Sequence, residues 1–141
     1  MIAVQDTTAA LVAYLLAQPV VTSLVGSRVY GLELPADETR HMPRAALVLT
    51  PSGGVSAGYT QSLPLEGSRF DAYCYAATPH EAQALRRSVR AAMRALSRVR
   101  IGTTLLHWVQ PAGGYSASRD AQTDWPRVWE SYSVLASETP A

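Results

Sequence analysis

The chain has 141 residues, of which 48% are apolar and 16% are charged. This size and composition favour one compact domain, residues 1–141, with a sizeable core, and they exclude a disordered or fibrous chain. Twelve basic residues against eleven acidic ones leave a net charge of +1, so the chain as a whole has no field that would attract nucleic acid or an anionic membrane.

The N-terminal third begins with helical signals. Apolar residues at helical spacing predict a helix over residues 8–18, capped by Thr7 or Thr8. A second short helical turn is predicted over residues 20–25, before a short extended segment at residues 29–30. The stretch that follows has two prolines and little periodicity, and it reads as an exposed connection.

Two strand signals frame a long polar stretch in the middle of the chain. Residues 45–50 form a short apolar run, and residues 69–76 alternate, with one row made of Phe70, Ala72, Cys74 and Ala76. The two segments are predicted to pair. The intervening Ser52–Gly67 contains four glycines and one charged residue, which predicts a long hairpin arm able to contact something outside the domain.

The clearest local signal is the start of a helix at Thr78-Pro79-His80-Glu81. Thr78 is the predicted N-cap, Pro79 takes the first helical position, and Glu81 completes a capping box. The helix is strongly amphipathic. Its apolar side faces a core, and an arginine row lies nearly opposite.

Two further strands are predicted near the C-terminus, over residues 101–110 and 127–135. A Gly-rich and Ser-rich loop, residues 112–125, is expected between them, and residues 136–141 are expected to be a frayed tail. The order of elements predicts an α+β fold, in which two main helices pack on one face of a mainly antiparallel sheet of four to five strands.

The sequence carries no convincing reactive centre. Cys74 lies in the predicted inward row and is interpreted as a core residue, and a single cysteine excludes an internal disulfide. The three histidines are scattered singly, which argues against a metal site, and no cofactor is predicted. Without lysine, the P-loop and Schiff-base chemistries are excluded. We therefore expect a protein that is not an enzyme.

Some exposed residues are candidates for contact with partners. The arginine row is interpreted first as the solvated face that an amphipathic helix normally has, and as an alternative it can face another subunit, an acidic protein or phosphate. Two further segments can extend from the domain to contact a partner. They are the arm and the Gly-rich loop, with the aromatic side chains in or next to that loop. The interface candidates are Arg87, Arg90, Arg94, Arg98, Tyr59, Gly53, Gly54, Tyr115 and Trp125.

Two ordered motifs resemble a known family. Leu24-Val25-Gly26-Ser27-Arg28-Val29-Tyr30 follows an N-terminal helix, and Phe70-Asp71-Ala72-Tyr73-Cys74-Tyr75-Ala76-Ala77-Thr78-Pro79-His80-Glu81-Ala82 leads a strand into an Arg-rich and Ala-rich helix. With Pro43 before an apolar strand, this arrangement is similar to the tail-completion, or tail-terminator, proteins of long-tailed bacteriophages and phage-like particles. The resemblance spans about residues 7–135.

The resemblance implies a structural virion protein at the head-tail junction, assembled in the host cytoplasm. It implies a hexameric ring that caps the tail tube, ends tube polymerisation and docks to the head connector. The implied partners are further copies of the chain, the tail-tube protein and the connector protein, while DNA passes through the ring without sequence-specific binding. No membrane is involved. The isolated chain is expected to be monomeric or weakly associated.

Two alternatives remain open at this stage. A small α+β nucleic-acid-binding module would use the basic face of the Arg-rich helix, and its binding would weaken steeply with salt. A small hydrolase or transferase would need a pocket that holds Cys74, His80 or Asp71.

Overall fold

The computed structural model describes residues 6–56 and 65–138 of the chain. Within these ranges the chain forms four helices and six strands. In chain order they are α1 (Thr7–Leu16), α2 (Pro19–Val25), β1 (Val29–Gly31), α3 (Ala36–Thr39), β2 (Ala46–Ser56), β3 (Leu65–Tyr75), α4 (Pro79–Ala95), β4 (Val99–Ile101), β5 (Thr104–Arg119) and β6 (Pro126–Glu138).

The α+β prediction is confirmed, but the sheet is larger and less regular than predicted. Its six strands are ordered β1-β2-β3-β6-β5-β4, and the β1–β2 pair is parallel while the other pairs are antiparallel. The predicted strand from residue 101 divides at Gly102, whose φ of 62° permits the turn between β4 and β5. The connection through α3 is long enough to bring β2 back parallel to β1.

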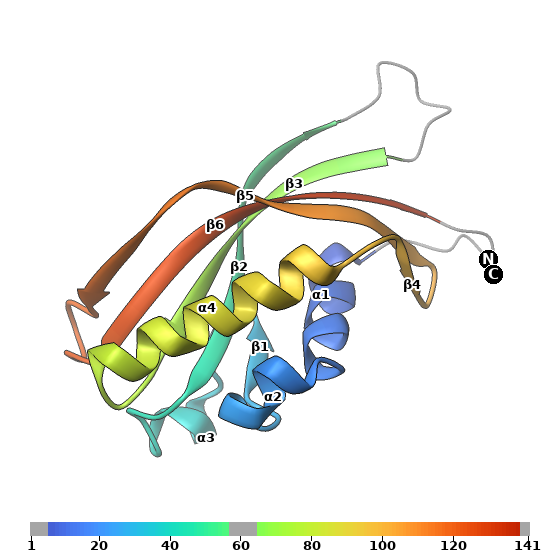
Figure 1. Ribbon diagram of the computed structural model, residues 1–141. Coiled ribbons are helices and arrows are strands. Elements are labelled where there is room, and N and C mark those ends of the chain that lie inside the picture. Colours follow the sequence, from blue (N-terminus) through green and yellow to red (C-terminus); the bar gives the residue numbers. More distant parts are fainter. Residues whose placement is uncertain (1–5, 57–64, 139–141) are drawn as a thin grey trace.

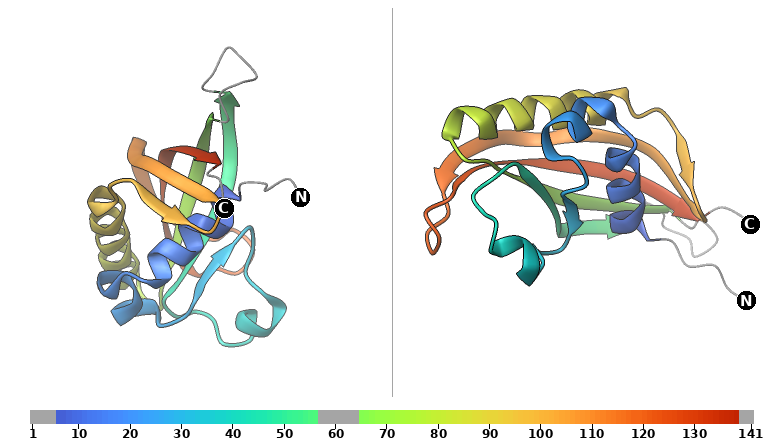
Figure 2. Two further views of the ribbon diagram at one scale, coloured as in Figure 1. Left: turned by 90° about the vertical axis from the view of Figure 1, so that its right-hand side faces the viewer. Right: turned by 90° about the horizontal axis from the view of Figure 1, so that it is seen from below.

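The sheet is strongly curved and wraps around the helices (Figure 1). α4 lies along the inner face beneath β5 and β6, and α1 and α2 lie beside it on the same side, as the second viewing direction also shows (Figure 2). The prediction that two main helices share one face is therefore confirmed. One apolar cluster joins α1, α2 and α4 to this inner face.

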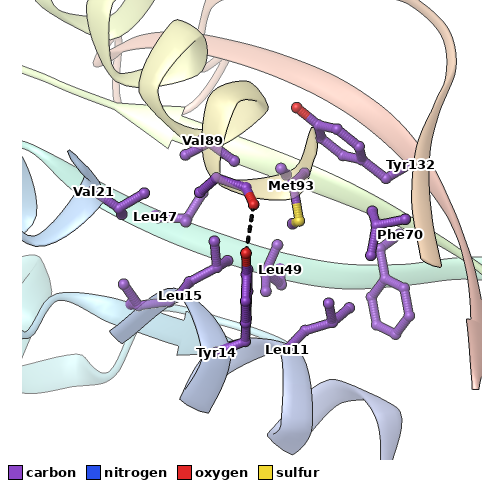
Figure 3. Close-up of a cluster of buried hydrophobic side chains, with 14 of the residues drawn as sticks. Leu11, Tyr14, Leu15, Val21, Leu47, Leu49, Phe70, Val89, Met93 and Tyr132 are labelled. Atoms are coloured by element: carbon purple, nitrogen blue, oxygen red, sulfur yellow. Dashed lines mark hydrogen bonds between the residues drawn. The ribbon is translucent and has the colours of Figure 1, made fainter. Parts of the chain in front are cut away.

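The inner face follows the predicted alternation of β3. Phe70, Ala72 and Cys74 are each buried to 2% exposure or less, and they belong to the same cluster as Leu11 and Leu15 of α1. Figure 3 shows Leu11, Leu15 and Phe70 in one cluster with Val89 and Met93 of α4. In the same view the buried Tyr14 hydroxyl donates to the Ala92 carbonyl oxygen at 2.7 Å, so α1 and α4 are joined by a hydrogen bond inside the core.

The helix boundaries largely match the prediction. Thr78 caps α4, and its hydroxyl accepts from the Glu81 backbone N–H. The cap of α1 was predicted wrongly, because Asp6 takes this position and its carboxylate accepts from the Ala9 N–H at 2.9 Å. The backbone of Asp6 is extended, as an N-cap requires, whereas Thr7 already belongs to the helix.

Two predictions about the C-terminal third are wrong. β5 does not end at residue 110 but runs through Gly113-Gly114 to Arg119, so only the end of the predicted 112–125 loop is a turn. A bulge between Pro111 and Tyr115 absorbs the glycines while pairing with β6 continues. The predicted frayed tail begins too early, since Ala136 and Ser137 are buried in β6.

Candidate functional site

The arginine row of α4 divides into exposed and inward-facing side chains. Arg87 and Arg94 are exposed. Arg98 is also exposed, but it lies beyond the last helical residue, Ala95, with a φ of 48°, so it extends the basic surface from a turn and not from the helix. Arg90 is only half-exposed, because it turns toward the sheet.

A buried carboxylate on β6 is the reason that Arg90 turns inward. The Glu130 side chain is 1% exposed, and its Oε2 lies 3.3 Å from Nη1 of Arg90. Its Oε1 accepts a hydrogen bond from the Tyr132 hydroxyl at 2.7 Å and lies 3.7 Å from Nη1 of Arg86. Burial, followed by this hydrogen bond, raises the pKa of Tyr132 well above its usual range. A charged cluster therefore lies between α4 and the sheet.

Arg86 extends this cluster to β5. Its side chain is 9% exposed, its Nε donates to Oε1 of Gln83 at 3.1 Å, and its guanidinium carbon lies 3.8 Å from the ring centroid of Tyr115. Tyr115 is itself 50% exposed, so one side of its ring is available to solvent. A cation–π interaction with Arg86 therefore holds the Tyr115 ring in position, and the exposed part of the ring is accessible to a partner.

Sequence reasoning did not identify Glu130 as the centre of this cluster. The available signal was period-two alternation, because Glu130 lies in the inward row of β6 between Val128 and Tyr132. Asp71 of the neighbouring β3 faces the opposite side of the sheet and accepts instead from the Ser131 hydroxyl at 2.5 Å.

Trp125 is less exposed than its place after a polar loop suggests. It is half-buried, and its ring meets Tyr75 edge to face at a centroid distance of 6.1 Å. The preceding turn is ordered by Asp120, whose carboxylate accepts from the backbone N–H groups of Gln122 and Thr123. These two bonds lower the pKa of Asp120. Part of the Trp125 side chain therefore serves the fold.

The arm is a hairpin as far as the structure describes it. β2 and β3 pair from Ala46 opposite Tyr75 to Ser56 opposite Glu66. Gly53 is exposed in β2, and Gly54 pairs with Ser68 of β3. Tyr59, the remaining candidate on the arm, lies outside the described residues.

An open pocket of about 460 Å³ lies where the arm meets the N-terminal end of α1. Asp6, Thr7, Pro51, Glu66 and Phe70 are among its lining residues. Two carboxylates at its rim make it unsuited to an anion, and in the described ranges no three His, Cys, Asp or Glu side chains gather to hold a metal ion.

The family model described as "Tail completion protein gp17" matches residues 9–128. The chain belongs to the tail completion protein family. Its fold is similar to that of a chain in a solved structure titled "Virion of native gene transfer agent (GTA) particle", with a TM-score of 0.66 and 16% identity over 94% of this chain and 99% of that one. No curated protein matches the chain. Family membership supports a structural role in a virion tail and confirms the resemblance seen in the motifs.

The chemistry of Cys74 agrees with a structural role for this tail completion protein. The thiol is fully buried in the cluster that contains Phe70 and Leu85, and this burial raises its pKa to about 12. A thiol in this environment is protonated at neutral pH and inaccessible to a substrate, so it does not serve as a nucleophile. His80, the proposed base, is exposed in the first turn of α4.

A helix that crosses a membrane must be long and apolar. In the described part of the chain, no single helix is sufficiently long and apolar to do so. α1 and α2 meet the length and composition criteria only when taken together, and they meet at a bend of 84°.

Proposed function

We propose that this tail completion protein forms a ring of six copies at the end of the tail tube, stops the tube from growing, and joins the tail to the head connector. DNA passes through the ring without sequence-specific contact. The match of the family model to residues 9–128 is the observation that carries this proposal. The site of action is the head-tail junction of the particle, after assembly in the host cytoplasm.

The form of the subunit supports assembly into a ring. The arm extends one end of the sheet, and the turn between β5 and β6 extends the other (Figure 1). Ring interfaces are heterologous, which means that one patch meets a different patch on the neighbour. A subunit with distinct projections at its two ends can provide such a pair. Its net charge of +1 gives little repulsion between copies.

The exposed arginines provide a surface for a partner within the particle. Arg87 and Arg94 lie on the solvent side of α4, and Arg98 continues this surface beyond the helix. Arg90 contributes less, because Glu130 holds it. We assign Arg87, Arg94 and Arg98 to contact with an acidic surface of the tube or connector protein.

Capping of the tail tube tests the proposed function directly. Tube protein from the same particle is polymerised with and without the chain, and more tube protein is then added. Tubes treated with the chain should carry a ring at one end in electron micrographs and should stop growing at that end, whereas untreated tubes should lengthen. Continued growth with no ring would contradict the proposal. Native mass spectrometry of the isolated chain should show mainly monomer.

Charge reversal tests the arginine surface. The double variant Arg87→Glu/Arg94→Glu should weaken docking of the capped tail to the connector, while Arg40→Glu, which alters an exposed arginine on another surface, should leave docking unchanged. Fluorescence anisotropy with a duplex DNA tests the nucleic-acid alternative. Binding that falls steeply between about 50 mM and 200 mM salt would favour that alternative over the ring.

A further inference from the structure

A six-residue pattern occurs twice in the chain. Pro51-Ser52-Gly53-Gly54-Val55-Ser56 and Pro111-Ala112-Gly113-Gly114-Tyr115-Ser116 share proline at the first position, the glycine pair and the final serine. The first copy lies in β2 and the second lies in β5. These strands are not neighbours, since β3 and β6 lie between them in the sheet.

The first glycine of each pair has the same backbone φ. Gly53 has a φ of 135° and Gly113 a φ of 134°, a region that L side chains rarely adopt. The ladder shifts register at both places, between Pro51 and Gly53 in β2 and between Pro111 and Tyr115 in β5. A bulge at the same sequence pattern therefore occurs on each side of the sheet, with one extra residue in β2 and two in β5.

Both segments lie on open edges of the sheet. β1 pairs with β2 only as far as Leu49, and β4 pairs with β5 only as far as Leu106. Beyond these residues, no strand in the described part of the chain lies on the outer side of β2 or β5. Figure 1 shows both strands continuing past their short edge partners.

These open edges are protected against strand pairing only at the proline and the bulge. Proteins protect an exposed edge with charged side chains, prolines, bulges or short strands. No charged residue occurs from Pro51 to Ser56 or from His107 to Ser118, and in each segment proline stands only before the glycine pair. Residues 113–118 are all exposed. The backbone after each bulge can therefore accept another strand.

The directions of the two strands fit pairing between copies. Three antiparallel steps separate β2 from β5, so the two strands run in opposite directions within one sheet. In a cyclic ring, one rotation about the axis relates each copy to the next, so every copy has the same orientation relative to that axis. When the β5 edge of one copy meets the β2 edge of the next, the two strands are antiparallel, as in the rest of the sheet.

We propose that the ring closes by strand addition, in which the β5 edge of one copy, residues 113–118, pairs with the β2 edge of the next, residues 50–56. This inference rests on the proposed ring. Neither edge has a charge with which to select a charged partner, and past the bulge each edge presents uncharged strand backbone that the edge of a second copy can pair with. A single open edge would permit only an isologous dimer, whereas two different edges permit a closed ring.

Cross-linking between copies tests the pairing. The double variant Ser52→Cys/Ser116→Cys places one thiol on each edge at exposed positions, and Cys74 remains in place because it is buried. A short bis-maleimide added to tube-capped rings should produce a ladder of covalent oligomers up to the size of the ring. Each single variant should give no ladder. Ser52→Cys/Ser133→Cys is the matched control, because Ser133 lies on β6, inside the sheet.

The outcomes separate this inference from the proposed function. Rings in electron micrographs without the ladder would overturn strand addition and leave the capping role standing. A covalent dimer from Ser116→Cys alone would show isologous β5 pairing and would also overturn it. The absence of rings under every condition would overturn both proposals.

A second variant tests the uncharged edge itself. Ser116→Lys/Ser118→Lys introduces two charges on exposed β5 positions, so the melting temperature should change little. Ring occupancy on tubes should fall by about tenfold or more, which requires only about 1.4 kcal/mol per contact. Ser23→Lys/Ser97→Lys, which changes exposed serines outside the strands, should leave occupancy unchanged. Normal occupancy of the edge variant would contradict the proposal.

Discussion

Two rows of α4 side chains meet the rest of the protein in opposite ways. Leu85, Val89 and Met93 form an apolar row within the main core, and Figure 3 shows Val89 and Met93 among side chains of α1 and the sheet. Arg86 and Arg90 form a second row, one turn apart, which meets the buried Glu130. The apolar row tolerates small shifts because it is not directional, whereas the charged row requires particular atoms to meet. The charged row therefore sets how β6 lies on α4.

Removal of the Glu130 carboxylate, which the charged row surrounds, should cause the largest loss of stability among these variants. Glu130→Ala leaves Arg86 buried without its counter-charge, and we expect a loss of about 3–5 kcal/mol in the free energy of unfolding. Urea denaturation followed by circular dichroism measures the loss. Glu138→Ala, an exposed position on the same strand, should change stability by less than about 0.5 kcal/mol. Equal losses from the two variants would show that the cluster has no special role.

Truncation within the apolar row tests the other half of the comparison. Leu85→Ala removes a side chain that is 1% exposed, and the transfer and cavity terms together should cost about 2–5 kcal/mol. The loss should be independent of salt, because no charge is involved. Since Arg90 is partly exposed, the loss from Glu130→Ala should respond to salt more strongly. Similar salt dependence in the two variants would contradict the distinction between the rows.

The hydrogen bond between α1 and α4 provides a smaller test. Tyr14→Phe removes the donor to the Ala92 carbonyl oxygen and leaves the ring in place, so we expect a loss of about 1 kcal/mol. Thermal unfolding by calorimetry measures it. Ala13→Gly, on the exposed side of the same helix, controls for helix propensity and should cost a similar amount, about 1 kcal/mol, without removing a buried contact. Hydrogen exchange near Ala92 should accelerate only in Tyr14→Phe.

The smallest expected effect concerns a second buried acid, Glu38 of α3. The Arg44 guanidinium donates to both of its carboxylate oxygens, at 2.7 and 2.8 Å, and these bonds lower the pKa of Glu38. A lowered folded-state pKa contributes stability that is present above the ordinary pKa of glutamate and is lost as the pH falls through the lowered value. The contribution should be about 1 kcal/mol or less, because Arg44 is 42% exposed.

The pH dependence of unfolding distinguishes this contribution from others. Glu38→Gln should flatten the acid limb of the stability curve and leave the curve parallel to wild type at neutral pH. Glu33→Gln, an exposed acid in the same connection, should leave the acid limb as it is. An unchanged acid limb in Glu38→Gln would mean that the bonds to Arg44 contribute nothing to stability.

The sequence predicted those parts of the fold that depend on local chemistry. The Thr78 cap, the inward row of β3 and the short helix α2 all follow from residues that lie close together in the chain. The continuation of β5 through Gly113-Gly114 was missed because local turn propensity was outweighed by pairing with β6. Tertiary pairing of this kind leaves no local trace.

The candidate surface was predictable only in part. Amphipathic spacing placed Arg87 and Arg94 on the solvent side of α4 correctly. The same spacing could not reveal that Arg90 turns toward Glu130, since the two residues are forty positions apart and meet only when α4 lies on β6. Buried charge partners are set by packing between elements, which one-dimensional periodicity does not record.

The crossover between β1 and β2 has a practical consequence for dissecting the molecule. The chain contains no lysine, so trypsin can cut only after arginine, and Arg40 is an exposed site in this crossover while Arg44 is held by Glu38. A cut after Arg40 divides the chain into two fragments whose parts still meet, because β1 pairs with β2 and Tyr14 bonds to Ala92. The nicked molecule should remain associated and can be reconstituted from separately labelled halves.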